Sequence, residues 1–290
     1  MSRLRRSMLY LPGNSPNMVQ DAHLYGADSI LIDLEDSVVI SEKDSARNLV
    51  RNALDNVDYG DIEVTIRINP VHTDFYKDDL KVIVPGKPDA IRVPKSESAE
   101  QIKKVDEFIT ELEKENGIEV GSVKLMPMIE SAKGVREVNE IAEASSRNVA
   151  LTIGGEDLAT DLGVTRTKGS EEIFTSRSLV VLAAKAAGID ALDTIYSNVN
   201  DIEGLRKETE LIKKMGFSGK AVIHPKQIKP VHEVFNPTEE EVREARKVVD
   251  AAEEAERKGQ GAITVNGKMV DYPIVDRARK TIAYAESTSK

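Results

Sequence analysis

The chain has 290 residues, and 50 acidic side chains outnumber 40 basic ones, which gives a formal net charge of −10 at pH 7. With a pI of about 5.1, the chain is not expected to bind nucleic acid or an anionic membrane, because both select basic surfaces. The sequence contains no cysteine, which excludes disulfides, thiolate zinc sites and a cysteine nucleophile.

The N-terminal residues 1–6 are basic, but the apolar run that follows covers only residues 8–11 and ends at Pro12. That run is too short for the core of a signal peptide. No apolar run approaches the length of about 18 residues that a membrane-spanning helix requires. We therefore expect a cytoplasmic protein with no membrane partner.

Eight short apolar runs alternate with helical patterns over residues 1–235. The predicted strands cover residues 7–11, 29–34, 63–68, 90–93, 123–129, 149–153, 192–196 and 221–223. The predicted helices include 14–25, 41–54 with Ser41 as its cap, a long helix starting at Ser98, 132–145, 176–187 and 202–215. Eight such units most economically form an α/β fold of the TIM (β/α)8 barrel type. A doubly wound open sheet remains the alternative, because hydrophobic periodicity does not reveal whether a sheet closes.

Residues 236–290 differ from the rest of the chain. A capped, acidic helix start at 237–241 leads into a highly charged helix with an Ala/Val stripe, and a last helix is predicted at 275–285. The eight units are complete before this segment begins. We therefore predict a C-terminal helical extension that packs on the barrel or on a neighbouring subunit.

The stretch 123–157 contains two predicted strands, and each ends in a carboxylate: Glu130 follows the first and Asp157 the second. In a parallel sheet both side chains would face the same crevice at the carboxyl ends of the strands. Two carboxylates without a Cys or His partner suit a hard cation such as Mg²⁺. Gly154 and Gly155 would let a ligand approach closely. The alternative is a helix cap or a structural salt bridge.

Arg67 lies near the end of an otherwise alternating apolar strand. A buried guanidinium needs a carboxylate partner, which could come from the protein or from a substrate such as a 2-oxo acid. Asp33, Glu35 and Asp36 place three carboxylates within four residues. Their mutual repulsion should raise the pKa of at least one, as a general base requires. The alternative is a solvated acidic turn.

Other polar residues also end predicted strands. Lys95 could form a Schiff base with a ketone, but it follows Pro94 among charged neighbours. Asn198 and His224 occupy similar positions, and a histidine before Pro225 is more typical of a structural role. The sequence has no Gly-x-Ser-x-Gly elbow, Walker loop or Gly-x-Gly-x-x-Gly motif. Hydrolase triads, NTPases and dinucleotide-binding enzymes therefore find no support.

Seven motifs occur in order along the chain, with an eighth in the extension. They are Arg-Ser-Met-Leu-Tyr-Leu-Pro-Gly-Asn (6–14), Asp-Leu-Glu-Asp-Ser-Val (33–38), Arg-Ile-Asn (67–69), Pro-Lys (94–95), Met-Ile-Glu-Ser-Ala (128–132), Gly-Gly-Glu-Asp-Leu (154–158), Gly-Lys-Ala-Val-Ile-His-Pro-Lys-Gln (219–227) and Gly-Lys-Met-Val-Asp-Tyr-Pro-Ile-Val (267–275). Together they resemble the citrate lyase β-subunit family, within the metal-dependent HpcH/HpaI-type aldolases and acyl-CoA lyases.

The resemblance implies a TIM barrel that cleaves a citryl thioester, carried on an acyl carrier protein (the γ subunit), to oxaloacetate and an acetyl thioester. It implies Glu130 and Asp157 as ligands of a Mg²⁺ cofactor, with Glu130 also at the substrate. It implies that Arg67 holds the carboxylate of the oxaloacetate half. Asp36 is the expected general base. The α subunit of citrate lyase is an expected partner, and the chain is expected to form a homo-oligomer.

Two other functions remain possible. A stand-alone malyl-CoA or citramalyl-CoA lyase would use nearly the same site on a free CoA thioester. Arg3, Arg5 and Arg6 would then be candidates for binding the 3′-phosphate of CoA, although they could equally serve an acidic carrier protein. A non-catalytic barrel protein is the second alternative. The combination of Arg67, Glu130 and Asp157 argues against it, because a protein without catalysis does not need all three.

Overall fold

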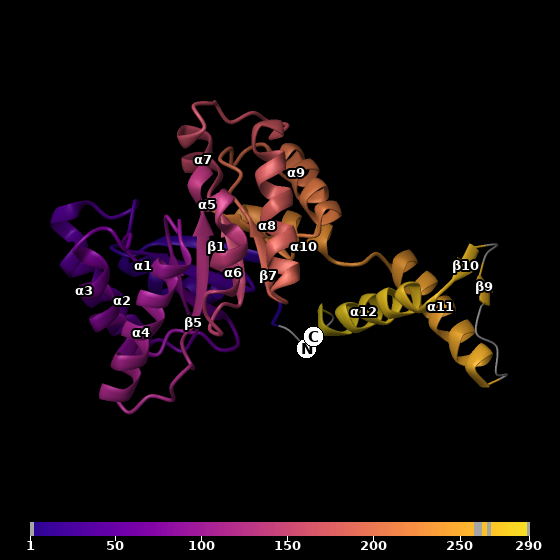
Figure 1. The fold of residues 1–290 in the computed structure, drawn as a ribbon, viewed down its shortest axis with the longest axis horizontal. Coiled ribbons are helices and arrows are strands. Elements are labelled where there is room, and N and C mark those ends of the chain that lie inside the picture. Colours follow the sequence, from indigo (N-terminus) through magenta and orange to yellow (C-terminus); the bar gives the residue numbers. More distant parts are fainter. Residues whose placement is uncertain (1–2, 258–262, 266–267, 289–290) are drawn as a thin grey trace. The chain divides into compact units, whose positions relative to one another are not determined.

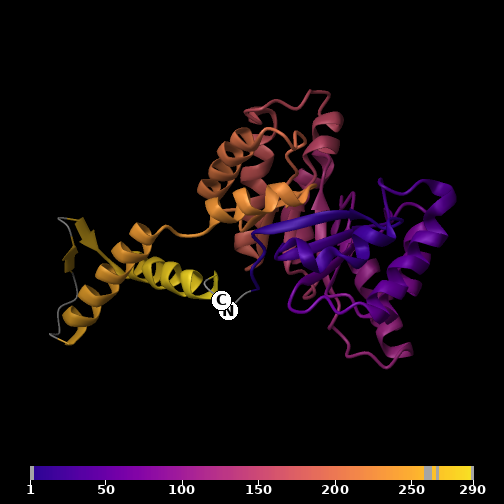
Figure 2. The same ribbon diagram turned by 180° about the vertical axis from the view of Figure 1, so that it is seen from behind.

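The computed structural model describes residues 3–257, 263–265 and 268–288 (Figures 1 and 2). The chain divides into two compact units, Met1–His232 and Glu233–Lys290. None of the helices in the described ranges is long and apolar enough to cross a membrane.

The first unit is a closed barrel of eight parallel strands in the order of the sequence. The strands are β1 (Ser7–Pro12), β2 (Ser29–Asp33), β3 (Glu63–Arg67), β4 (Ala90–Val93), β5 (Lys124–Ile129), β6 (Ala150–Ile153), β7 (Asp190–Asp193) and β8 (Gly219–Val222). The ring closes because β1 pairs with both β2 and β8. Closure confirms the predicted TIM barrel and excludes the doubly wound open sheet.

Helices and short 3₁₀ turns connect the strands and surround the barrel (Figures 1 and 2). The α-helices are α1 (Pro16–Gln20), α2 (Lys43–Asn56), α3 (Phe75–Ile83), α4 (Ala99–Glu115), α5 (Ala132–Arg136), α6 (Val138–Glu143), α7 (Gly155–Asp161), α8 (Phe174–Ala186), α9 (Ile202–Met215) and α10 (Ile228–Phe235). The 3₁₀ turns are η1 (Ala22–Tyr25), η2 (Ile40–Glu42), η3 (Val84–Gly86), η4 (Glu171–Ile173) and η5 (Pro225–Gln227).

The barrel interior is packed with side chains. Alternate residues of the strands point inward, and the buried inner cluster consists of Met8, Leu31, Ala90, Met126, Ala150 and Leu192. Two residues further along β1, β2 and β4, the inward positions hold Tyr10, Asp33 and Arg92. The apolar core therefore gives way to a polar layer towards the carboxyl ends of the strands.

Several element boundaries differ from the prediction. Ser41 does not cap a helix: it lies in η2, and α2 begins at Lys43 after Glu42 without a side-chain cap. Strand β7 ends at Asp193, earlier than predicted, and the Oγ1 of the next residue, Thr194, accepts a hydrogen bond from the Gly155 N–H. The predicted helix 132–145 is interrupted at Glu137. Ser98 does cap α4, where its hydroxyl accepts from the N–H of Gln101.

The second unit contains α11 (Glu239–Arg257), α12 (Tyr272–Thr288) and the antiparallel strands β9 (Ile263–Val265) and β10 (Lys268–Val270). Thr238 and Glu241 form a capping box before α11: the Thr238 N–H donates to the Glu241 carboxylate, and the Glu241 N–H donates to the Thr238 hydroxyl. Apart from Phe235, the buried apolar side chains that the structure describes in this unit are alanines and valines. This unit therefore has only a thin core of its own.

Candidate active site

Arg67 and Asp33 form a bidentate ion pair at the carboxyl end of the barrel. They are the last residues of β3 and β2 and lie opposite each other in the parallel register. Arg67 donates from Nε and Nη2 to the two oxygens of Asp33 over 2.6 and 2.7 Å. Burial by itself would raise the pKa of Asp33, but the charge and hydrogen bonds of Arg67 outweigh it and hold that pKa below its usual value. The carboxylate that Arg67 requires thus comes from the protein.

Glu35 and Asp36 approach the remaining nitrogen of Arg67. Nη1 lies 2.8 Å from Glu35 Oε2 and 3.5 Å from Asp36 Oδ2. Glu35 is buried, and this burial, reinforced by the charges of Asp36 and Asp33, raises its pKa to about 7 although Arg67 opposes the shift. The Asp36 side chain is 62% exposed. One of the three carboxyl groups, that of Glu35, therefore has a raised pKa as the sequence predicts, but the main cause is burial and not the repulsion among the three.

Glu130 follows β5 directly and is buried. Its Oε1 accepts a hydrogen bond of 2.6 Å from the Lys95 N–H, whereas its Oε2 is buried without a partner in the described part of the chain. Lys95 has a φ of 48°, a left-handed backbone that costs a lysine about 1–2 kcal/mol. Burial raises the pKa of Glu130 to about 8, and the charges of Glu35 and Asp157 add to the effect.

The two glycines before Asp157 allow close approaches of side chains rather than an unusual backbone. A Cβ at Gly154 would overlap Glu130 Oε2 and would lie 2.6 Å from the methyl carbon of Met128. A Cβ at Gly155 would lie 2.9 Å from Thr194 Cγ2. Helix α7 can therefore start directly against the ends of β5 and β7, which brings Asp157, in its first turn, into the electrostatic field of Glu130.

Glu130 and Asp157 fit a divalent cation. The unpartnered oxygen of Glu130 is a buried acceptor, and no ion pair neutralises either carboxylate within the described ranges. These ranges contain no cluster of three or more His, Asp or Glu side chains that could hold a metal. Mg²⁺ does not require one, because it commonly binds through one or two carboxylates and keeps waters or substrate oxygens as its other ligands. The competing interpretation, a structural salt bridge, finds no partner here.

The other candidate residues do not join this site as reactive groups. The Lys95 side chain is partly exposed, and the contact of this residue with Glu130 is through the backbone. Asn198 is exposed, and its side chain accepts a hydrogen bond from the N–H of Asn200. His224 caps η5 by accepting from the Lys226 N–H through Nδ1, as expected of a structural histidine.

Tyr10 and Arg92 also lie at this end of the barrel, although no strand-end pattern in the sequence indicates them. The Tyr10 ring centroid lies 5.4 Å from the guanidinium carbon of Arg67 and 5.7 Å from that of Arg92. Arg92 donates to the Tyr10 hydroxyl over 2.9 Å. A charged residue inside the apolar run Ala-Ile-Arg-Val is the same signal that pointed to Arg67 and could have identified Arg92 as well.

The three N-terminal arginines are not placed to bind a CoA phosphate at this site. Their carboxylate partners lie at or just before the starts of strands, at the opposite end of the barrel. The pairs are Arg3 with Asp89, Arg5 with Glu63 and Asp190, and Arg6 with Asp28. The expectation of a phosphate patch is therefore wrong, because these arginines neutralise buried or half-buried acids that precede the strands.

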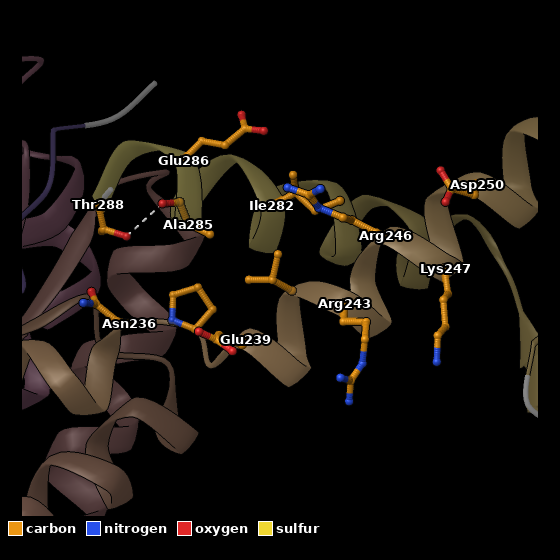
Figure 3. A pocket seen from close by; sticks show the side chains of 12 residues that line it. Asn236, Glu239, Arg243, Arg246, Lys247, Asp250, Ile282, Ala285, Glu286 and Thr288 are labelled. Atoms are coloured by element: carbon orange, nitrogen blue, oxygen red, sulfur yellow. Dashed lines mark hydrogen bonds between the residues drawn. The ribbon is translucent and has the colours of Figure 1, made fainter. Parts of the chain in front are cut away.

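A hollow of about 860 Å³ lies in the C-terminal unit, between α11 and α12 (Figure 3). Two of its charged lining residues, Arg243 and Lys247, form ion pairs within α11, with Glu240 at 3.3 Å and Glu244 at 2.6 Å. It contains none of the carboxylates at the strand ends. We therefore place the active site on the barrel and not in this hollow.

The comparisons with known proteins agree on one protein family. The model of the HpcH/HpaI aldolase/citrate lyase family matches residues 6–225. The citrate lyase subunit beta of Leuconostoc mesenteroides subsp. cremoris is 47% identical over 285 residues, covering 98% of this chain and 94% of that protein. A (3S)-malyl-CoA thioesterase of Cereibacter sphaeroides is 37% identical over 282 residues, covering 97% of this chain and 95% of that protein.

Solved structures show the same fold. The protein CitE from Mycobacterium tuberculosis, in complex with magnesium, acetoacetate and coenzyme A, superposes with a TM-score of 0.79 at 28% identity over 98% of both chains. The citrate lyase beta subunit from M. tuberculosis, complexed with oxaloacetate and magnesium, gives a TM-score of 0.69 at 29% identity over 81% of this chain and 98% of that one.

Proposed function

Because the chain belongs to the HpcH/HpaI aldolase/citrate lyase family, we propose that it is a Mg²⁺-dependent carbon–carbon lyase. Its reaction is the cleavage of a citryl thioester to oxaloacetate and an acetyl thioester, the role of a citrate lyase β subunit. The observation that carries the proposal is Glu130, a buried carboxyl group with an unpartnered oxygen, beside Asp157 and within the field of Arg67.

Glu130 and Asp157 are the proposed Mg²⁺ ligands. When bound, Mg²⁺ supplies Lewis-acid stabilisation to the hydroxyl oxygen that becomes the ketone of oxaloacetate. The complexes of magnesium with related M. tuberculosis proteins support this cofactor. The Lys95 N–H fixes one oxygen of Glu130 and leaves the other free for a cation.

Arg67 is proposed to bind the carboxylate of the oxaloacetate half. Asp33 holds two of its nitrogens, so the guanidinium has one orientation before substrate arrives. Such preorganisation removes the entropic cost of ordering a long side chain during binding. Burial would lower the pKa of Arg67, but the charge of Asp33 raises it well above the usual value, so Arg67 is a permanent cation.

Asp36 is the proposed general base. It is exposed, and it lies 3.5 Å from Arg67 Nη1, so a bound carboxylate would bring the substrate hydroxyl close to it. Loss of the hydroxyl proton to Asp36 lets the carbon–carbon bond break, and the electron pair leaves as the enolate of the acetyl thioester. Glu35, with its pKa of about 7, is the competing carboxyl group, and a Glu35→Gln variant distinguishes the two.

The proposed partners are an acyl carrier protein that bears the citryl group and the α subunit of a citrate lyase, with CoA as an alternative carrier. The extension, predicted as residues 236–290, is proposed to pack on the barrel or on a neighbouring copy in a homo-oligomer. Its thin core supports this proposal, since a unit of this size rarely buries enough surface alone. The cytoplasmic location stays a prediction.

The second candidate is a stand-alone malyl-CoA or citramalyl-CoA lyase. It is favoured by the relative that is named a (3S)-malyl-CoA thioesterase and matches nearly the whole chain. Arg3, Arg5 and Arg6 are paired at the far end of the barrel and favour neither CoA nor a carrier protein, whereas the 47% identity to a citrate lyase subunit beta exceeds the 37% identity to this thioesterase. Citryl cleavage is therefore the preferred proposal.

The test is to measure oxaloacetate released from citryl-CoA and glyoxylate released from malyl-CoA, each with Mg²⁺ and with EDTA. We expect oxaloacetate release that requires Mg²⁺ and no reaction of malyl-CoA. Cleavage of malyl-CoA alone would select the second candidate. Activity that persists in EDTA would reject the metal site and favour the alternative in which Lys95 forms a Schiff base with a ketone.

A further inference from the structure

Arg92 is a buried cation for which the described residues provide no counter-ion. It lies opposite Arg67 in the register of β3 and β4, and only 2% of its surface is exposed. Its Nη1 donates to the Tyr10 hydroxyl over 2.9 Å, its Nη2 lies 2.6 Å from the sulfur of Met8, and its Nε has no partner in the described part of the chain. A thioether is a weak acceptor, so this guanidinium is poorly compensated.

The other buried arginines of the described ranges differ from Arg92. Each has at least one carboxylate within ion-pair distance, and they are Arg5, Arg47, Arg67, Arg147 and Arg177. A buried charge without a partner is costly, and proteins normally avoid it. The uncompensated charge of Arg92 therefore indicates that a bound anion, which is not part of the protein, completes this part of the site.

Tyr10 connects Arg92 to the mouth of the barrel. Arginine is a donor only, so the Tyr10 oxygen accepts from Arg92 and its own O–H remains free to donate. Tyr10 is partly exposed, and no acceptor for its O–H is present among the described residues. The same ring lies beside Arg67, the proposed carboxylate-binding residue. An anion that enters next to Arg67 can thus accept a hydrogen bond from Tyr10 and experience the charge of Arg92.

We propose that Tyr10 and Arg92 recognise the second carboxylate of the substrate and make the site selective for a four-carbon dicarboxylic 2-oxo acid. The inference rests on the proposed function, in which Arg67 binds the first carboxylate of the oxaloacetate half. Tyr10 donates to the second carboxylate. Arg92 is a positioning residue, which orients the Tyr10 hydroxyl and whose positive charge, not balanced by the protein, attracts this carboxylate. A monocarboxylic acid such as pyruvate uses only the Arg67 half of this arrangement.

The test compares two acids that differ by one carboxylate. Binding of oxaloacetate and of pyruvate is measured by calorimetry, in Mg²⁺, for the full chain and for Arg92→Met, Arg92→Lys and Tyr10→Phe. We expect Arg92→Met and Tyr10→Phe to weaken oxaloacetate binding at least about tenfold, the loss expected for one charge-assisted hydrogen bond. Pyruvate binding should change less than about threefold. Arg92→Lys, which keeps the charge, should recover part of the oxaloacetate affinity.

Thr65→Val is the matched control. Thr65 points into the same barrel interior one layer below and is fully buried. Its replacement should therefore leave the binding of both acids unchanged. Equal weakening of both acids by Arg92→Met would show a merely structural role and overturn the inference, as would unchanged oxaloacetate binding in Tyr10→Phe. A parent protein that binds pyruvate as tightly as oxaloacetate would overturn this inference alone. A parent protein that binds neither acid would reject the proposed function and, with it, this inference.

Discussion

Two buried charge clusters in the barrel unit show opposite designs. The flank cluster, between β7, β8, α8 and α9, consists of Arg177, Asp193, Glu208 and Lys220. Arg177 donates to the two oxygens of Asp193 over 2.7 and 2.9 Å, and Lys220 Nζ lies 2.7 Å from Asp193 and 2.9 Å from Glu208. Two positive and two negative groups meet there. In the described chain Arg177 Nη1 has no close acceptor, and Glu208 Oε2 has no aligned hydrogen bond but lies 2.9 Å from Lys220 Nζ.

The mouth cluster, at the carboxyl ends of the strands, consists of Asp33, Glu35, Arg67 and Glu130. It has three carboxyl groups for one guanidinium, and two of those carboxyl groups have raised pKa values of about 7 and about 8. In the flank cluster, burial alone would raise the pKa of Glu208, but Lys220 and Arg177 hold it far below its usual value. The flank cluster is therefore complete without a ligand, whereas the mouth cluster requires a cation to balance it.

The largest predicted effect is the loss of activity when Glu130 in the mouth cluster is replaced by Gln. The amide keeps an oxygen for the Lys95 N–H but loses the charge that Mg²⁺ needs, so activity should fall at least about a thousandfold, as for loss of an essential charge-stabilising group. Folding should be preserved, because the change removes a poorly compensated buried carboxyl group. Activity assays and thermal unfolding of the same sample test both parts. A variant that retains activity, or that is unfolded, would contradict this view of the mouth cluster.

Glu208→Gln should have the reverse effect. It leaves Lys220 and Arg177 with one buried carboxylate between them, so the free energy of unfolding should fall by about 3 kcal/mol or more. Turnover per folded molecule should be nearly unchanged, since Glu208 belongs to the flank cluster. Chemical denaturation gives the stability, with Glu210→Gln as the matched control: Glu210 is exposed on the same helix, and its replacement should be neutral. A loss of activity without a loss of stability would place the flank cluster in catalysis.

Asp36→Asn sharpens the comparison within the mouth cluster. Removing a general base should lower turnover about a hundredfold, while Mg²⁺ and oxaloacetate binding stay intact, because Arg67 and Glu130 are untouched. Turnover and calorimetric binding are measured for this variant and for Glu119→Gln, which removes an exposed charge in the loop before β5. If Asp36→Asn keeps full turnover and Glu35→Gln loses it, the base is Glu35.

The sequence predicts the positions of Glu130 and Asp157 because hydrophobic periodicity locates strand ends, and a parallel barrel brings all these ends to one rim. It does not predict the partner of Arg67, because the pairing with Asp33 depends on the register between β2 and β3. Local patterns carry no information on register, and the same limit hides the left-handed backbone of Lys95 that directs its N–H to Glu130.

Other features escaped prediction for different physical reasons. Helices α3 and α7 have only nine and seven residues, which is too short for a helical periodicity to be recognised in the sequence. The raised pKa of Glu35 depends on burial, which the acidic run 33–36 does not reveal. The arginines at positions 3, 5 and 6 suggested a binding patch, because sequence alone does not show that acids preceding the strands neutralise them.

The smallest predicted effect is a pH dependence that only the mouth cluster should show. Metal-free native protein keeps protons on Glu35 and Glu130 up to about pH 7 and about pH 8, whereas the same groups in the unfolded chain release theirs near pH 4.5. Between these limits the native state binds more protons than the unfolded state, so its stability falls as pH rises. From pH 6 to pH 7 the free energy of unfolding should fall by about 2 kcal/mol.

Mg²⁺ should reverse this loss, because it binds the deprotonated carboxylates and therefore stabilises the native state more at pH 8 than at pH 6. Glu130→Gln should remove most of both the pH dependence and the Mg²⁺ effect. The stabilising contribution of Glu208 should be constant over the same range, since its lowered pKa keeps it charged throughout. Thermal unfolding at pH 6, 7 and 8, with Mg²⁺ or EDTA, tests this prediction. A stabilisation by Mg²⁺ that is equal at all three pH values would mean that the cation does not bind at the mouth cluster.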